Sequence, residues 1–246
     1  MKRVIVILCF LPMFILNNGY GQSESEQLER EAMIEGTFRK YLMTGDESLA
    51  RMLANSKNAY TFFCNALFVD NAEVAINLYT KFIETSPKYG LGEAYFNRGF
   101  QYNQLDSSEL AISDFDKAIE LGIKDPYLYY FKGASLAEIE KYDDAIESYS
   151  ISIKMNSKFG LAYLMRGNSY YKKKDYSKAI SDYNKVIELD KKDDRAYLMR
   201  GVSYEALEDY KKALEDYQKA KNIKGPNVET ANKFIERVNK KIKDKQ

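Results

Sequence analysis

The six residues "AYLMRG" occur twice in this chain, from Ala162 to Gly167 and again from Ala196 to Gly201. The two copies are 34 residues apart, and the residues around them are also alike. The longer stretches "AYLMRGNSY" and "AYLMRGVSY" differ at one position only. Similarity of this length at a fixed distance indicates an internal repeat.

The same 34-residue period extends beyond these two copies. Glycine recurs at Gly99, Gly133, Gly167 and Gly201. An alanine follows each glycine by 12 residues, at Ala111, Ala145, Ala179 and Ala213. An aromatic residue follows each alanine by four residues, at Phe115, Tyr149, Tyr183 and Tyr217. Small and large residues at fixed phases of one period are typical of stacked structural repeats.

Each repeat predicts two helices joined by a turn. Tyr163, Gly167 and Tyr170 are spaced as one face of a helix, and the segment 179–186 shows the same spacing after a polar turn at 172–177. Glycine inside a helix costs about 1 kcal/mol relative to alanine. Four such glycines at one phase therefore predict that the second helix packs closely against the first, with its alanine at the contact.

These residues resemble the tetratricopeptide repeat, a family of 34-residue helix–turn–helix units. The family has an aromatic residue, Gly and an aromatic residue in its first helix, and Ala, an aromatic residue and a small residue in its second. The matching residues are Tyr95, Gly99, Tyr102, Ala111, Phe115 and Ala118 in one unit, Tyr163, Gly167, Tyr170, Ala179 and Tyr183 in another, and Tyr197, Gly201, Tyr204, Ala213, Tyr217 and Ala220 in a third. The unit around Gly133 departs from the pattern at Leu136 and Ser152, and the family's terminal proline is displaced, to Pro126 and Pro226.

The N-terminus has the pattern of a secretory signal. Lys2 and Arg3 precede an apolar run, residues 4–16, which is shorter than a comfortable membrane-spanning helix. Gly19 and Gly21 supply small residues before a predicted cleavage site after Gly21. We therefore expect an exported bacterial protein, periplasmic or secreted. The alternative is an uncleaved segment that remains as a membrane anchor.

The resemblance implies an all-α fold, a right-handed α-solenoid with N-terminal leading helices and a C-terminal capping helix. The first unit is degenerate, because Phe63 replaces its glycine. The capping helix is predicted from one apolar stripe, formed by Val228, Ala231, Ile235, Val238 and Ile242. The predicted boundaries are 1–21 for the signal peptide, 22–55 for the leading helices, 56–89, 92–125, 126–159, 160–193 and 194–227 for five repeat units, and 228–246 for the capping helix and a basic tail.

Composition argues against several classes of function. The chain has no His, which removes the commonest general base and metal ligand. We find no catalytic constellation, cofactor motif or metal site, and a formal charge of +1 gives no basic field for nucleic acid. Cys64 would be the only cysteine after cleavage, and we interpret it as a core residue rather than a reactive thiol. The sequence predicts a non-catalytic protein, with an unrecognised carboxylate enzyme as the alternative.

A basic residue precedes each repeat glycine, at Arg98, Lys132, Arg166 and Arg200. The second helices carry, at one shared phase, Asp114, Ser148, Asp182 and Asp216. We predict a ladder of ion pairs between these two sets, interrupted once where Ser148 replaces the carboxylate. The alternative is a basic stripe that faces a ligand.

The resemblance also implies that the first helices line a concave groove, which binds a peptide or another protein. The predicted groove residues are Phe96, Asn97, Phe100, Asn103, Tyr130, Ala134, Leu164, Asn168, Tyr171, Leu198, Val202 and Glu205. Most of them are uncharged, which favours an apolar protein segment over the C-terminal carboxylates that some family members clamp. The alternative is a structural role in a cell-envelope assembly, through the convex face or the basic C-terminal helix. Membrane contact is expected only through an uncleaved N-terminus or the basic tail.

Overall fold

The computed structural model describes residues 24–54 and 59–244, and all regular secondary structure within them is α-helical. The helices are α1 (Glu24–Thr44), α2 (Glu47–Ala54), α3 (Tyr60–Leu67), α4 (Ala72–Glu84), α5 (Leu91–Gln104), α6 (Ser108–Glu120), α7 (Pro126–Glu138), α8 (Tyr142–Met155), α9 (Gly160–Lys172), α10 (Tyr176–Leu189), α11 (Asp194–Ala206), α12 (Tyr210–Ile223) and α13 (Val228–Asp244). The predicted signal peptide, residues 1–21, lies outside the described residues. None of the helices in the described ranges is long and apolar enough to span a membrane.

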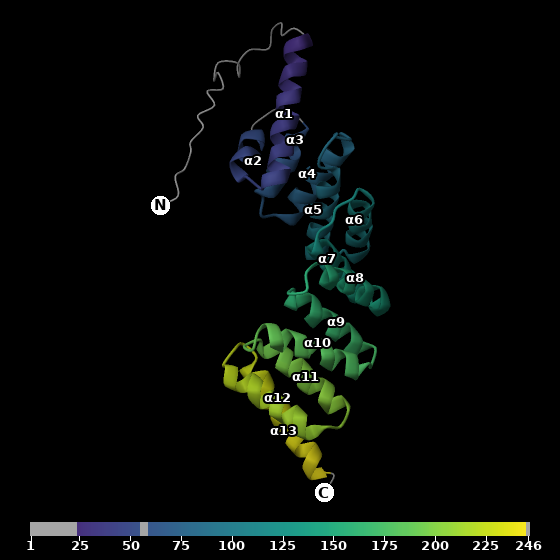
Figure 1. Ribbon diagram of the computed structural model, residues 1–246, viewed down its shortest axis with the longest axis vertical. Helices are drawn as coiled ribbons and strands as arrows, with labels where there is room; N and C mark the ends of the chain where they lie inside the picture. Colours follow the sequence, from purple (N-terminus) through teal and green to yellow (C-terminus); the bar gives the residue numbers. More distant parts are fainter. Residues whose placement is uncertain (1–23, 55–58, 245–246) are drawn as a thin grey trace, which may run out of the picture.

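The helices stack in chain order, so that each packs mainly against the helix before it and the helix after it. The result is an elongated, bent array with α1 near one end and α13 at the other (Figure 1). This arrangement confirms the predicted α-solenoid. The antiparallel pairs α5–α6, α7–α8, α9–α10 and α11–α12 contain the four repeat glycines.

The repeat glycines lie where the two helices of a pair approach most closely. A Cβ atom added to Gly167 would lie 2.7 Å from Cε1 of Tyr183, which is closer than real Cβ contacts. The equivalent distance is 2.6 Å between Gly201 and Tyr217. The repeat alanines at the same contact have no exposed surface. The sequence therefore predicted the packing of each pair correctly.

The turn inside each pair is also the same from unit to unit. Lys174 has a φ of +63°, and the residues at the same phase, Asp106, Glu140 and Glu208, have values between +53° and +60°. The next amide then donates back across the helix end, as from Asp175 N to Tyr170 O at 2.9 Å. The Asp175 carboxylate in turn accepts from Lys178 N at 3.2 Å and caps α10.

The N-terminal end of the solenoid is closed by aromatic packing. Phe38 of α1 has no exposed surface. Its ring centroid lies 4.4 Å from that of Tyr60, 5.1 Å from that of Phe63 and 5.9 Å from that of Phe82. Helix α1 is thereby fixed to the α3–α4 pair, in which Phe63 occupies the glycine position.

The C-terminal end is closed by α13. Ala231 and Val238 are fully buried against α11 and α12, and the Phe234 ring lies 5.2 Å from the Tyr217 ring. The predicted apolar stripe thus faces the solenoid. Helix α13 begins 34 residues after α11, so it occupies the place of the first helix of a further repeat.

Candidate protein-binding surface

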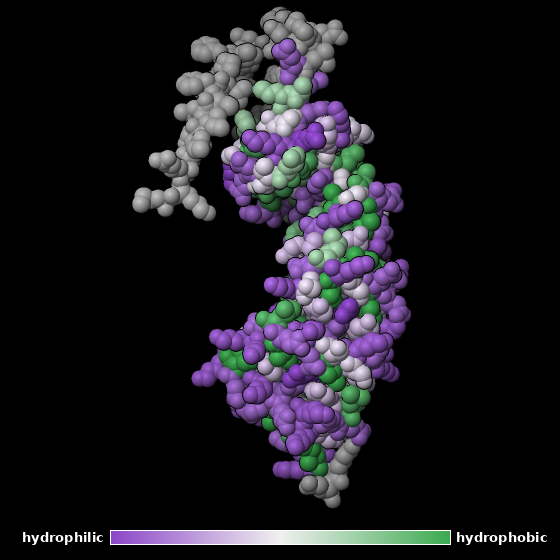
Figure 2. Space-filling model, in the orientation of Figure 1, coloured by the Kyte–Doolittle hydropathy of each residue, from purple (hydrophilic) through white to green (hydrophobic). Residues whose placement is uncertain are grey.

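The first helices of the pairs line one side of the solenoid. Besides its neighbours in the chain, α5 contacts α7, α7 contacts α9, and α9 contacts α11. Because these helices approach one another, the array curves around them and they form its inner side. The molecule is hollowed on this side, between the N-terminal helices and the broader C-terminal half (Figure 2).

An arginine beside the repeat glycine joins three helices. In α9, Arg166 donates through Nε and Nη2 to Asp182 of α10 at 2.8 and 2.7 Å, and through Nη1 to Ser150 Oγ of α8 at 2.9 Å. The same three bonds join Arg98 to Asp114 and Thr80, and Arg200 to Asp216 and Asn184. The predicted ladder is confirmed at these three rungs. The arginine side chains are only 15–19% exposed and their guanidinium groups are committed to ion pairs, so the alternative of a ligand-facing basic stripe is wrong for them.

The rung at Lys132 differs from the others. Its ammonium pairs with Asp116 of the preceding helix α6 at 2.6 Å. Ser148 of α8 offers no carboxylate at the phase of the missing partner, as the sequence predicted. Lys132 therefore ties α7 backward to α6 but not forward to α8.

A continuous row of aromatic rings crosses the inner side of α5 and α7. The ring centroids of Phe100 and Phe131 are 4.8 Å apart, and those of Phe131 and Tyr130 are 5.2 Å apart. Tyr130 lies 5.1 Å from Phe159, which lies 4.8 Å from Tyr127. We call these five residues the aromatic band. Such edge-to-face and tilted pairs fix the orientation of the rings before any ligand arrives.

The aromatic band is open to solvent at one end. Tyr127 is 50 % exposed, whereas Phe159 beneath it is buried. Tyr130 is partly buried between them, and this burial raises the pKa of its phenol, although the nearby Arg195 of α11 acts in the opposite direction. The band therefore combines an accessible ring with a rigid apolar floor.

The predicted groove residues on α5 and α7 are all partly exposed; they are Phe96, Asn97, Phe100, Asn103, Tyr130 and Ala134. Asn103 Nδ2 donates to Ser135 Oγ at 2.9 Å, so this amide joins the two helices. Tyr130 packs against Tyr149 as well as Phe159. Tyr130 therefore contributes to the core as well as to the inner side.

The expected row of apolar side chains does not continue onto α9 and α11. Leu164 and Leu198, at the same phase as Tyr130, are 3 % and 5 % exposed and belong to the core. The prediction that they line an open groove is therefore wrong. A leucine at this phase is short enough to be covered by the neighbouring helices, whereas the longer rings of Phe96 and Tyr130 reach the surface.

The remaining predicted residues are engaged within the protein. Asn168 Oδ1 accepts from Tyr183 OH at 2.8 Å. Tyr171 stacks on Tyr176 at 5.4 Å, and Val202 packs in the core between α11 and α13. Tyr171, Val202 and Glu205 also line a shallow hollow of about 330 Å³ beside α13.

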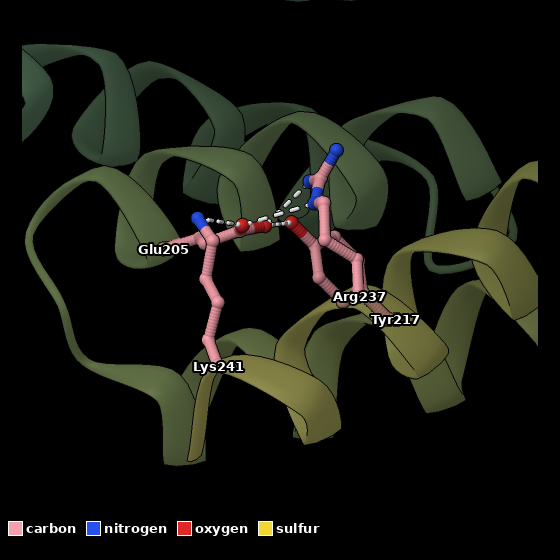
Figure 3. Close-up of polar contacts among 4 residues, drawn as sticks. All are labelled: Glu205, Tyr217, Arg237 and Lys241. Atoms are coloured by element: carbon pink, nitrogen blue, oxygen red, sulfur yellow. Dashed lines mark hydrogen bonds and ion pairs between the residues drawn. The ribbon is translucent and has the colours of Figure 1, made fainter. Parts of the chain in front are cut away.

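Glu205 holds the capping helix rather than facing an open groove (Figure 3). The residue is 8 % exposed, and its carboxylate accepts from Arg237 at 3.0 and 2.5 Å, from Lys241 at 2.9 Å and from Tyr217 OH at 2.8 Å. Burial alone would raise the pKa of Glu205, but hydrogen bonds from Arg237, Lys241 and Tyr217 outweigh it and the pKa lies below its usual value. Its prediction as a groove residue is corrected accordingly.

Sequence reasoning missed three members of the aromatic band, Tyr127, Phe131 and Phe159. A signal for Tyr127 was present, because it precedes Tyr130 by three residues and so shares its helix face. Phe159 gives no such signal, because it lies in a loop and reaches Tyr127 only through the stacking of two repeats.

The described residues contain no group of three or more acidic or Cys side chains placed to hold a metal ion. Cys64 is buried, and burial raises the pKa of its thiol to about 12. A thiol in this state is a poor nucleophile at neutral pH.

Comparison with known proteins agrees with this geometry. The family model of the tetratricopeptide repeat matches residues 92–121 and 194–227, and a second TPR model matches residues 167–208. These ranges coincide with the pairs of helices stacked around the repeat glycines. This chain contains tetratricopeptide (TPR) repeats. A search of curated proteins gave no match.

Solved structures share the fold of this TPR protein. The crystal structure of MamA is 25% identical, covers 64% of this chain and 85% of its own, and superposes with a TM-score of 0.59. YrrB is 22% identical over 79% of this chain and 95% of its own, with a TM-score of 0.61. MamA from Desulfovibrio magneticus RS-1 is 20% identical over 68% and 96%, with a TM-score of 0.64.

Proposed function

We propose that this TPR protein is a non-catalytic scaffold that binds an apolar segment of another protein on the inner side of α5 and α7. The observation that carries the proposal is the aromatic band, which has a half-exposed ring at Tyr127 over a packed apolar floor. Aromatic anchors that sit in a rigid surround commonly dominate protein interfaces. Support also comes from YrrB, whose structure is described as a TPR protein with an unusual peptide-binding site.

Tyr127→Ala should weaken binding by about 1–3 kcal/mol, because truncation of an interface anchor typically costs this much. The probe is a peptide selected from a displayed library of random peptides on the wild-type protein, and its affinity is measured by fluorescence anisotropy. Tyr127 suits this test better than Tyr130, because Tyr130 also packs against Tyr149 in the core.

Leu110→Ala is the matched control. Leu110 is 53 % exposed on α6, a second helix on the outer side, so its loss should leave both affinity and thermal unfolding unchanged. Normal binding by Tyr127→Ala would reject the aromatic band as the site. Together with lost binding after Lys240→Glu/Lys243→Glu, which reverses exposed charges of α13 and keeps its buried face, it would favour the alternative role in an envelope assembly.

We propose further that the protein works outside the cytoplasm, in the periplasm or as a secreted protein. The basis is the sequence pattern of residues 1–21, a basic start followed by an apolar run and small residues. N-terminal sequencing of protein from the native cell should begin at or near Gln22. Recovery of intact Met1 in the membrane fraction would instead indicate a retained anchor.

A further inference from the structure

The loops that lead from one repeat to the next lie along a single edge of the solenoid. These loops, residues 121–125, 156–159, 190–193 and 224–227, are called here the loop edge. Contacts join neighbouring repeats at two places along this edge. The Phe159 ring lies 4.8 Å from the Tyr127 ring at the start of α7, and Asp194 at the start of α11 accepts from Asn227 N at 3.2 Å.

The loop edge carries unpaired positive charge. It holds five lysines against three aspartates, and the lysines are Lys124, Lys158, Lys191, Lys192 and Lys224. All five are exposed, and none forms an ion pair with a residue that the structure describes. Their ammonium groups are therefore free to meet a partner.

The aspartates of the loop edge are used locally. Asp125 accepts from Tyr127 N at 2.7 Å, and Asp190 accepts from Lys192 N at 2.8 Å. Asp193 caps α11 and holds the Arg195 guanidinium. Arg195 neutralises Asp193, so the five lysines exceed the two remaining aspartates and the edge keeps a net positive charge.

The opposite edge of the solenoid carries more acidic residues than lysines. Its loops, residues 105–107, 139–141, 173–175 and 207–209, carry five acidic residues against three lysines. Here Lys173 pairs with Asp143, and Asp175 and Asp209 pair with lysines of their own helices. Positive charge is thus concentrated on one side of the inner face.

The loop edge adjoins the aromatic band. Phe159 belongs to both, and Lys158 is its neighbour in the chain. Tyr127 and Tyr130 lie in the first turns of α7, next to the same loops, and Arg195 is close enough to act on the Tyr130 phenol. A segment on the aromatic band therefore runs beside Lys158 and the loop that carries Lys124, and it meets the other lysines where it continues along the loop edge.

We propose that the partner is an acidic protein segment, which lays apolar side chains on the aromatic band and directs Asp or Glu side chains toward the loop edge. This inference rests on the proposed function and specifies its ligand. Charges at the rim of an interface act mainly on association rate and on the choice of partner, whereas the apolar anchors supply most of the affinity. The expected binding is therefore sensitive to salt.

Four fluorescein-labelled peptides of about 14 residues test the proposal. An extended peptide of this length spans roughly 45 Å. The first alternates Leu or Phe with Glu, the second replaces every Glu by Gln, and the third replaces every Glu by Lys. The fourth keeps Glu but replaces Leu and Phe by Ser. In about 50 mM salt the first peptide should bind at least about tenfold more tightly than the second, and this ratio should shrink toward one in about 500 mM salt.

The double variant Lys158→Glu/Lys192→Glu should remove the preference for the first peptide and leave the affinity for the second within about twofold. The control is Lys174→Glu/Lys211→Glu, which makes the same charge change at exposed positions of the opposite edge, in the α9–α10 turn and the first turn of α12. The control variant should keep the preference, because its lysines lie away from the loop edge.

Three outcomes would overturn the inference, and they separate it from the proposed function. If the Gln peptide binds as tightly as the Glu peptide and Tyr127→Ala weakens both, the groove function stands without the acidic partner. If the Glu–Ser peptide binds as tightly as the first peptide, the edge attracts polyanions and the aromatic band plays no part. If none of the four peptides binds, the groove function itself is rejected.

Discussion

Gly167→Leu should unfold at a markedly lower urea concentration than the wild type. Even a Cβ atom at this position would lie 2.7 Å from Cε1 and 3.1 Å from Cζ of Tyr183, a ring with no exposed surface. The ring cannot turn away, because it is packed between α9 and α10. Overpacking of a well-packed core typically costs about 1–3 kcal/mol, and a buried ring in the path of a leucine places the expected loss at about 3 kcal/mol or more.

Gly36→Leu is the matched control for this prediction. Gly36 is also a helical glycine, in α1, but a Cβ atom there meets no atom within 4 Å. Leucine favours the helix over glycine, so this variant should be as stable as the wild type or slightly more stable. Equal unfolding midpoints for Gly167→Leu and Gly36→Leu would show that the repeat glycines are not at a helix contact.

Asp182→Ala should destabilise the protein by about 3 kcal/mol, measured by urea unfolding. The change leaves the Arg166 guanidinium, whose side chain is 19% exposed, without its charged partner between α9 and α10. Removing one member of a buried ion pair costs about 3–5 kcal/mol, because the other charge stays buried and unpaired. The low end of this range applies, since Ser150 Oγ still accepts one hydrogen bond from Arg166.

Two further variants identify the cause of that loss. Arg166→Met combined with Asp182→Leu removes both charges and should recover most of the stability. Glu120→Ala breaks the solvent-exposed pair with Lys117 and should leave the midpoint unchanged. A double variant as unstable as Asp182→Ala would show that packing, rather than the unpaired charge, causes the loss.

The fold was predictable because its constraints repeat. A glycine at a close helix contact cannot be replaced without a clash. These contacts are therefore visible in the sequence as a glycine at the same position of four 34-residue units. The rungs were predictable for a related reason, since Arg166 and Asp182 recur with a spacing of 16 residues in three of the four units. Even the exception at Ser148 was visible in the sequence.

The candidate site was predictable only in part, because exposure depends on the size of a side chain and on its neighbours. Leu164 and Tyr130 share a phase, yet only the longer side chain reaches the surface. Glu205 is bound by Arg237 and Lys241, which follow it by 32 and 36 residues in a segment without the repeat pattern. No local sequence pattern predicts the contact between Glu205 and these two residues.

The incomplete rung at Lys132 also has a consequence for how the array unfolds. Arg98 and Lys132 tie α4 through α7 together, and Arg166 and Arg200 tie α8 through α12, so the charged ties are interrupted between α7 and α8. A linear array separates into cooperative blocks where the coupling between neighbours is weakest. Helices α7 and α8 stay coupled without a charged tie, because a Cβ atom on Gly133 would lie 2.8 Å from the Tyr149 ring and Ser152 Oγ donates to Pro126 O at 2.7 Å. The two halves of the array are therefore joined at this point by close packing and a neutral hydrogen bond, which high salt cannot screen.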